Sequence, residues 1–277
     1  MTEGDRMQTL HVEDRLLDPV VEPGSALVMW LGQAGFAIKF RSAMVWVDPY
    51  LSNYLAEWWD VERVAPRPFA PQDVAPDVVI ASHWHPDHLD PPTCRALAKS
   101  SRAIFVAPPS GALQLRHFGV PEERIRSVVY GDRVDVAGVG VTCHFARHDV
   151  EPGLIAEDAM TMSIEMDGVH VFHSGDTEYD DRIWETRRAS PVDAALVCMN
   201  GTGGNMDALE AAFLAFRLDA RLAVPMHFGM WSDANYGPRA TLDPAEFVAF
   251  WERLTSGRPS HVPVLGETFV IHGRAPR

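Results

Sequence analysis

The chain has 277 residues, of which 47% are hydrophobic and 22% are charged, and these proportions are typical of a globular protein rather than a disordered or collagen-like one. Its 24 basic and 38 acidic residues leave a net charge of −14, which disfavours DNA binding because a phosphate backbone would be repelled. No stretch reaches the roughly 18 uncharged apolar residues that a membrane span needs.

The amino terminus and the cysteines both favour a cytoplasmic protein. Residues 1–15 are polar and acidic, unlike a signal peptide. The three cysteines are isolated in the sequence and form neither an even disulfide framework nor a CxxC pair. We therefore expect one cytoplasmic domain over residues 1–277, in which an extension at 1–25 precedes a core at 26–272. A homo-oligomer is compatible with this sequence.

The first apolar segments predict strands. Segments 26–31, 36–40 and 45–47 are rich in β-branched and aromatic residues and are separated by short turns, which is typical of a β-meander. The proline-containing segment 52–77 is then expected to be a long irregular loop. Its Trp58 and Trp59 could cover a cavity, pack on the core or form an interface.

From residue 78 onward, strands and helices alternate in two similar halves. Strands 162–165 and 170–173 are expected to form a hairpin around Asp167-Gly168. The repeated order predicts an α/β fold of two mixed sheets packed face to face, with helices on both outer faces. The other expected strands are 78–81, 104–107, 127–130, 133–136, 139–145, 194–198, 222–225 and 268–272, and the expected helices are 93–99 with Asp90 as its N-cap, 111–118, 182–188, 208–217 and 244–254.

Three histidines fall within six residues directly after the strand predicted at 78–81. The motif is His83-Trp84-His85-Pro86-Asp87-His88, and imidazole and carboxylate are ligands that Zn²⁺ prefers, with Mn²⁺ and Fe²⁺ also suitable. Because alternate residues of an extended chain point the same way, His83 and His85 could hold one ion while Asp87 and His88 reach another. Four ligands are too few for two closed sites, so we expect more downstream.

Three further ligand-type residues each follow a predicted strand. They are His148, Asp176 and His227. Strand ends from two packed sheets can converge on one cleft, so this repeated placement favours a shared metal site. His144 competes with His148, but we favour His148 because it lies where the strand should give way to a loop.

With these residues the chain resembles the metallo-β-lactamase-fold hydrolases. Within that superfamily it is most similar to the ascorbate-6-phosphate lactonase group, through the HxHxDH motif and the segments WLGQAGF at 30–36, DPYLS at 48–52, HSGDT at 173–177 and PMH at 225–227. The resemblance runs from about residue 26 to 268 and implies a four-layer αββα sandwich.

The resemblance also implies a ligand set for two divalent metal ions. One ion would take His83, His85 and His148, and the other Asp87, His88 and His227, with Asp176 bridging the pair. Zn²⁺ or Mn²⁺ is expected, with iron as a further option. The nucleophile would be a metal-bound hydroxide. The two carboxylates, Asp87 and Asp176, are the predicted catalytic residues.

Other residues could support this site, although each also has a simpler structural explanation. Asp48 and His173 could lie behind the ligands, where Asp48 would orient a ligand imidazole. Arg239 could hold a carboxylate or phosphate. The glycine-rich segment 200–205 could cradle an anionic group with backbone N–H donors. The candidates for substrate binding are Gln33, Asn200, Asn205, Trp231, Tyr236 and Arg239.

The expected function is that of a metal-dependent hydrolase, an enzyme that opens a small sugar-derived lactone, with or without a phosphate group. A phosphodiesterase acting on a small phosphodiester, with nuclease-like or phospholipase-D-like chemistry, is an alternative, because the same nucleophile attacks phosphorus. A non-catalytic metal-binding protein is another. The expected partner is a small-molecule substrate rather than DNA.

Overall fold

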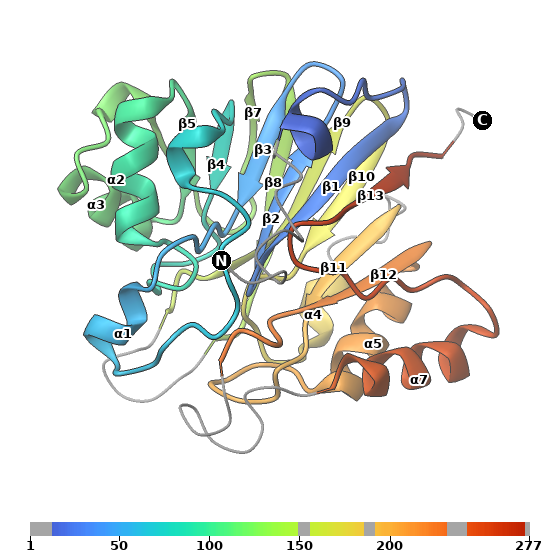
Figure 1. Ribbon diagram of the computed structural model, residues 1–277. Helices are drawn as coiled ribbons and strands as arrows, with labels where there is room; N and C mark the ends of the chain where they lie inside the picture. The colour runs from blue at the N-terminus through green and yellow to red at the C-terminus, as the bar shows by residue number, and fades with distance from the viewer. Residues whose placement is uncertain (1–12, 149–155, 186–191, 232–242, 275–277) are drawn as a thin grey trace, which may run out of the picture.

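The computed structural model describes residues 13–148, 156–185, 192–231 and 243–274. Two β-sheets lie face to face, with helices outside each of them (Figure 1). The α/β sandwich that the sequence predicts is therefore confirmed. Among the described helices, none combines the length and the apolar character needed to cross a membrane.

The first sheet has seven strands and contains the amino-terminal meander. The strands β13, β1, β2 and β3 at one end pair antiparallel, and β3 to β6 at the other end are parallel to one another. In spatial order the strands are β13 (Thr268–His272), β1 (Ser25–Gly32), β2 (Gly35–Lys39), β3 (Met44–Val47), β4 (Val78–Ile80), β5 (Ile104–Ala107) and β6 (Ile125–Ser127).

The second sheet has six strands. A parallel set, β10 to β12, continues into an antiparallel set, β9 to β7. In spatial order the strands are β12 (Leu222–Met226), β11 (Ala194–Cys198), β10 (Val169–His173), β9 (Met160–Met166), β8 (Val139–Phe145) and β7 (Arg133–Val136).

Helices cover the outer faces because their apolar sides bury against the sheets. In Figure 1, α2 and α3 lie outside the first sheet, while α5 and α7 lie outside the second. The helices are α1 (Tyr54–Trp58), α2 (Pro91–Ser100), α3 (Pro109–His117), α4 (Asp181–Glu185), α5 (Ala208–Arg217) and α7 (Pro244–Thr255).

Most of the predicted elements are present, with ends that match or are shifted by one or two residues. The predicted hairpin is confirmed: β9 and β10 pair antiparallel, and both Asp167 and Gly168 have positive φ angles, 54° and 79°, as a type I′ turn requires. Asp90 is confirmed as the residue before α2. The predicted helix 182–188 is described only over Asp181–Glu185, and its remainder lies outside the described residues.

Two sequence predictions are wrong. The strand predicted at 127–130 is β6, which lies earlier because Ile125–Ser127 pair with Phe105–Ala107 of β5. The side chain of Asp132 then accepts a hydrogen bond from Val129 N and closes a turn. The segment 52–77 is not wholly irregular, since it contains α1 and a short 3-10 turn at Pro71–Asp73.

Candidate metal centre

Each ligand candidate follows a strand of one of the two sheets. The segment His83–His88 follows β4 of the first sheet, and His148, Asp176 and His227 come after β8, β10 and β12 of the second. All seven side chains are buried. The two sheets bring these strand ends together, so residues 144 positions apart in the chain, His83 and His227, share one cluster.

Three imidazoles form what we call the three-histidine group: His83, His85 and His148. His85 Nδ1 lies 2.9 Å from His83 Nε2 and 3.2 Å from His148 Nε2. The three nitrogen atoms thus face one another rather than pointing into solvent. Neutral imidazoles in this arrangement direct lone pairs at a common centre, which is the donor set of a borderline divalent cation.

A second set, the mixed group, consists of Asp87, His88 and His227. Asp87 Oδ2 is 3.6 Å from His88 Nε2 and 3.7 Å from His227 Nε2. This set combines two imidazoles with a carboxylate. It therefore offers a negative charge that the three-histidine group lacks.

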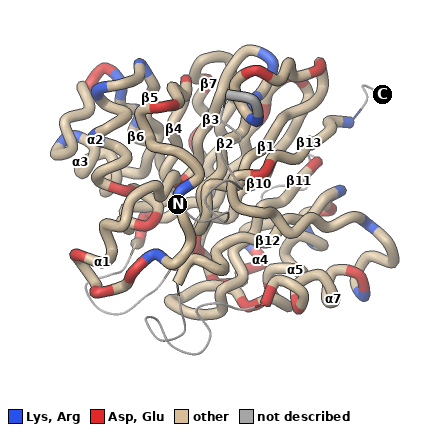
Figure 2. The backbone as a smooth tube through the Cα atoms, viewed as in Figure 1, with Lys and Arg blue, Asp and Glu red and all other residues tan. Residues whose placement is uncertain are grey.

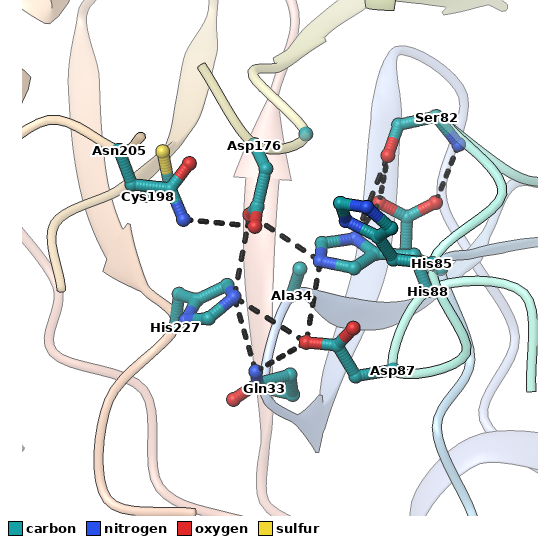
Figure 3. A network of polar contacts seen from close by, with 12 residues as sticks. Gln33, Ala34, Ser82, His85, Asp87, His88, Asp176, Cys198, Asn205 and His227 are labelled. Atoms are coloured by element: carbon teal, nitrogen blue, oxygen red, sulfur yellow. Dashed lines mark hydrogen bonds and ion pairs between the residues drawn. The ribbon is translucent and has the colours of Figure 1, made fainter. Parts of the chain in front are cut away.

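Asp176 lies between the two groups (Figure 3). Its Oδ1 atom is 3.3 Å from both His88 Nε2 and His227 Nε2, and its Oδ2 atom is 3.9 Å from His148 Nε2. Asn205 Nδ2 donates a hydrogen bond of 2.8 Å to the same Oδ2. One carboxylate therefore reaches both sets of nitrogen ligands.

The residues present fit a bound cation. Among the described residues, His88 Nε2 and Asp176 Oδ1 are buried and make no hydrogen bond of good geometry. Buried polar atoms without partners are rare and costly. A metal ion coordinated by these two atoms would supply the missing partner for each. The set of nitrogen and oxygen ligands suits Zn²⁺, Mn²⁺ or Fe²⁺.

The outer nitrogens of three ligand rings are held by hydrogen bonds. His88 Nδ1 donates to Asp48 Oδ2 at 2.8 Å, His83 Nδ1 to Ser82 Oγ at 2.9 Å, and His148 Nδ1 to the carbonyl of Gly204 at 3.3 Å. These acceptors favour a proton on Nδ1, so that each Nε2 could offer its lone pair to a bound metal ion.

Asp48 connects two of these rings. Besides its contact with His88, it accepts hydrogen bonds from Ser82 N at 2.7 Å and from Ser82 Oγ at 2.6 Å. The Ser82 hydroxyl donates its hydrogen to Asp48 and accepts a hydrogen bond from His83 Nδ1, so that Asp48 also orients the His83 ring through Ser82. Ser82 was not among the residues predicted to support the site, although its position immediately before the first histidine of the motif could have indicated this role.

Gln33 supports the mixed group. Its Nε2 atom donates to Asp87 Oδ2 at 2.9 Å and lies 3.0 Å from His227 Nε2 (Figure 3). The carbonyl of Gln33 accepts hydrogen bonds from His227 N and from Trp30 Nε1, both at 3.0 Å. A turn of the first sheet thus holds a ligand loop of the second.

Backbone strain is concentrated at this junction. Gln33, Asp48 and His227 have φ angles of 55°, 45° and 67°, in the left-handed region that non-glycine residues seldom adopt. Such conformations persist only where surrounding contacts hold them, and they occur often at functional sites. Gly175, beside Asp176, has a φ of 53°, and a Cβ atom there would come within 2.6 Å of Ser82 Cβ.

The two groups differ in their electrostatics. Burial, reinforced by the neighbouring imidazoles of His88, His85 and His148, holds the pKa of His83 well below its usual range, and burial also lowers the pKa of His148. Burial opposes charge on His88 too, but Asp176, Asp87 and Asp48 outweigh it and raise its pKa well above the usual range. His83 and His148 of the three-histidine group are thus kept neutral, whereas the carboxylates of the mixed group and Asp176 attract positive charge.

Other predicted residues lie at varying distances from the cluster. His173 joins the chain beside Gln33 to the chain beside Asp176. Its Nε2 atom donates to the carbonyl of Ala34 at 2.8 Å, and its Nδ1 atom accepts from Gly175 N at 3.0 Å. His144 contacts Ser163 Oγ at 2.7 Å and belongs to none of the ligand sets among the described residues. The ring of Trp231 is buried against Tyr50.

The segment 200–205 turns two groups toward the ligands, the carbonyl of Gly204 and the amide of Asn205. Asn200 is buried, and its Oδ1 atom has no hydrogen-bond partner among the residues described. Tyr236 and Arg239 lie outside the described residues. The substrate-binding roles of these side chains stay predictions.

Comparison with known proteins gives the family. Residues 27–227 match the family model described as the beta-lactamase superfamily domain. A UPF0173 metal-dependent hydrolase from Methanoculleus marisnigri is 32% identical over 83% of this chain and 90% of its own length, and one from Pelotomaculum thermopropionicum is 30% identical over 83% and 93%.

The fold is also that of solved structures. Igni18, a metallo hydrolase from Ignicoccus hospitalis, superposes with a TM-score of 0.69 at 19% identity, covering 90% of this chain and all of its own. Because so low an identity speaks for the fold alone, the family rests on the sequence matches. The chain belongs to the beta-lactamase superfamily and is a metal-dependent hydrolase of the metallo-β-lactamase fold.

Proposed function

We propose that this hydrolase opens small lactones, with two divalent metal ions held by the three-histidine group and the mixed group. The observation that carries the proposal is the convergence of seven buried ligand side chains, two of whose atoms, His88 Nε2 and Asp176 Oδ1, have no hydrogen-bond partner among the described residues. When bound, the metal ions would acidify a water molecule and polarise the carbonyl oxygen of the substrate.

The described residues offer no competing protein nucleophile at the cluster. Burial raises the pKa of the Cys198 thiol to about 12, so thiolate is scarce at neutral pH. The Ser82 hydroxyl donates to Asp48 and accepts from His83. All three cysteines are free and buried, which supports the proposal of a reducing, cytoplasmic location.

The side chains at the cluster have distinct positioning tasks. Asp176 places a carboxylate between the two groups, within reach of nitrogen atoms of both. Asp48 fixes the ring of His88, and Gln33 fixes the carboxylate of Asp87. These hydrogen bonds hold the ligands in place before substrate arrives, which lowers the reorganisation needed in the reaction.

The charges near the cluster favour a neutral carbonyl substrate over a phosphodiester. The guanidinium of Arg63 donates to the carbonyls of Tyr50 and Ala65 at 2.6 and 2.7 Å. Arg147, next to His148, pairs with Glu178 at 3.2 Å. Both guanidinium groups are thus engaged within the protein, and neither is placed to hold a phosphate group of a substrate.

The test compares chelated protein with protein reconstituted with Zn²⁺ or Mn²⁺. The substrates are δ-valerolactone, gluconolactone, 6-phosphogluconolactone and bis(p-nitrophenyl) phosphate. We expect metal-dependent opening of lactones that exceeds diester hydrolysis. Faster hydrolysis of the diester would replace the proposal with the phosphodiesterase alternative. No metal-dependent turnover of any lactone would reject it.

A further inference from the structure

Three tryptophans form a continuous aromatic surface beside the three-histidine group. Trp58 ends α1, Trp59 follows it, and Trp84 lies between the ligands His83 and His85. The rings of Trp58 and Trp59 are stacked, with centroids 4.8 Å apart and planes at 15°. The ring of Trp84 meets Trp58 edge-on at 6.3 Å. We call these three residues the tryptophan wall.

The tryptophan wall begins at a metal ligand. The ring of His85 lies 4.7 Å from that of Trp84 and 6.4 Å from that of Trp59, centroid to centroid, and both contacts are edge-on. The ring of His85 thus contacts both indoles and, through its Nδ1 atom, the other two imidazoles of the three-histidine group. The wall is part of the surroundings of the reacting centre, not a remote surface patch.

The wall is partly open to solvent. Trp58 is 43% exposed, and Trp59 and Trp84 are half-buried. Tryptophan is costly to leave in water, and exposed aromatic clusters commonly mark binding sites. Because this surface lies next to His85, a proposed metal ligand, the substrate is the molecule most suited to bind there.

The wall is also held in shape before substrate binds. Trp59 packs against a small core that includes Tyr50, Leu55 and Trp231. Trp59 N donates to the carbonyl of Leu55 at 2.8 Å, and Arg63 ties the following chain to Tyr50 O. A preformed apolar surface loses little entropy on binding, which favours affinity.

The charges around the wall oppose an anionic substituent. Glu57, Asp60 and Glu62 are exposed, and Figure 2 shows acidic positions in red on α1 and the chain next to it. Arg63, the adjacent cation, is occupied by backbone carbonyls. A phosphate group placed here would face like charges, whereas a flat uncharged ring would lose nothing to electrostatics.

From these observations we infer that the tryptophan wall binds a flat apolar, preferably aromatic, group of the substrate. The inference rests on the proposed lactonase function and narrows its substrate class. The carbonyl lies at the metal centre, and the ring fused or attached to it lies against Trp59 and Trp84. Trp58 extends the surface for larger groups. A sugar phosphate lacks such a ring and would not use this subsite.

The test uses two lactones that share a six-membered ring. Dihydrocoumarin carries a fused benzene ring, and δ-valerolactone does not. In metal-reconstituted protein, Trp59→Ala should raise the KM for dihydrocoumarin about tenfold while the KM for δ-valerolactone stays nearly constant. Trp58→Ala should raise the KM for dihydrocoumarin by a smaller factor, and Trp58→Phe should keep the KM of the unmodified protein. Phe216→Ala, which removes an exposed ring on α5, is the control.

A binding measurement separates this inference from the proposed function. The ketones 2-tetralone and cyclohexanone resemble the two lactones but cannot be hydrolysed. Calorimetry should show about tenfold weaker binding of 2-tetralone to Trp59→Ala, with cyclohexanone unaffected. If no lactone is opened but 2-tetralone binding still depends on the wall, the lactonase proposal fails and the subsite stands. Because Trp58 is exposed, its variants remain informative should Trp59→Ala not fold.

Two outcomes would overturn the subsite. Equal effects of Trp59→Ala on both ketones, or none on either, would show that the wall does not recognise the aromatic ring, and equal effects of Trp58→Ala would show the same should Trp59→Ala not fold. Loss of self-association in sedimentation by Trp58→Ala, with unchanged ligand binding, would instead assign the tryptophans to an interface between copies of this chain. The metal content of every variant should equal that of the unmodified protein.

Discussion

The three-histidine group and the mixed group lie side by side, yet they hold their ligands in different ways. The three-histidine group contains no carboxylate, and its His83 and His148 rings are oriented by a serine hydroxyl and a backbone carbonyl. The mixed group contains a carboxylate and is oriented by Asp48 and Gln33. The mixed group therefore has the stronger electrostatic attraction for a cation and more of the supporting side chains.

This difference suggests unequal binding of two ions. Coulomb attraction to carboxylates is strong in a buried site, where screening by water is weak. We expect the mixed group to fill first as metal is added, and the three-histidine group to fill second. Asp176, which reaches both groups, would couple the two events.

The largest expected effect comes from Asp176→Ala, which removes the carboxylate between the groups. We expect kcat/KM to fall roughly 10³-fold or more, because both sets lose a ligand and the reacting centre loses its charge balance. Steady-state kinetics and metal analysis on the same sample measure it. Full activity at full metal content would contradict the bridging position.

Removing one imidazole from each group tests the comparison directly. His148→Ala should weaken the more weakly held ion roughly 100-fold or more and leave the other in place, whereas His227→Ala should weaken the tighter one. Chelator competition and equilibrium dialysis give the affinity and the number of bound ions. His117→Ala, an exposed histidine of α3, is the control. Identical changes in both variants would show that the groups are not distinct.

Asp48→Asn should weaken metal binding about 10- to 100-fold, because the His88 ring loses the acceptor that orients it. Asp193→Asn is a matched control. Asp193 is also buried and accepts a backbone hydrogen bond, from His170 N at 2.9 Å, but it does not contact the ligands. Both variants should lose thermal stability, and only Asp48→Asn should change the metal affinity. A similar loss of affinity in both would mean a general structural effect.

The smallest effect is expected from Gln33→Ala. Its amide donates a charge-assisted hydrogen bond to Asp87, and such bonds contribute about 1.5–3 kcal/mol. We expect about tenfold weaker binding at the mixed group, with the three-histidine group unaffected. Titration with Co²⁺, monitored through its absorption bands, would distinguish binding at the mixed group from binding at the three-histidine group. Weaker metal binding at the three-histidine group instead would contradict the role of Gln33 in supporting the mixed group.

Several features could be predicted because they depend on neighbouring residues. The hairpin at Asp167-Gly168 is an example, since two residues that tolerate positive φ define a type I′ turn. The spacing of His83, His85, Asp87 and His88 after an apolar strand is another. The position of β6 was mispredicted because it depends on pairing with Phe105–Ala107, which is distant in the sequence.

The supporting contacts could be predicted only in part. Asp48 was a candidate from its place after a strand, but its two hydrogen bonds to Ser82 join residues 34 positions apart. The bond from Gln33 to Asp87 joins residues 54 apart. Such pairs depend on the packing of loops from different strands, which no local pattern encodes.

By itself, the sequence determined the ligand types, their order and the alternating strands and helices, because these follow from side-chain chemistry and local backbone preferences. Residue chemistry alone left the grouping of these side chains open; the family resemblance implied it, and the tertiary structure brings the side chains into those groups, with Asp176 between them. Only the tertiary structure decided that Trp58, Trp59 and Trp84 gather beside His85. The physical reason is that two sheets must bury their apolar faces against each other, and this packing sets which strand ends meet.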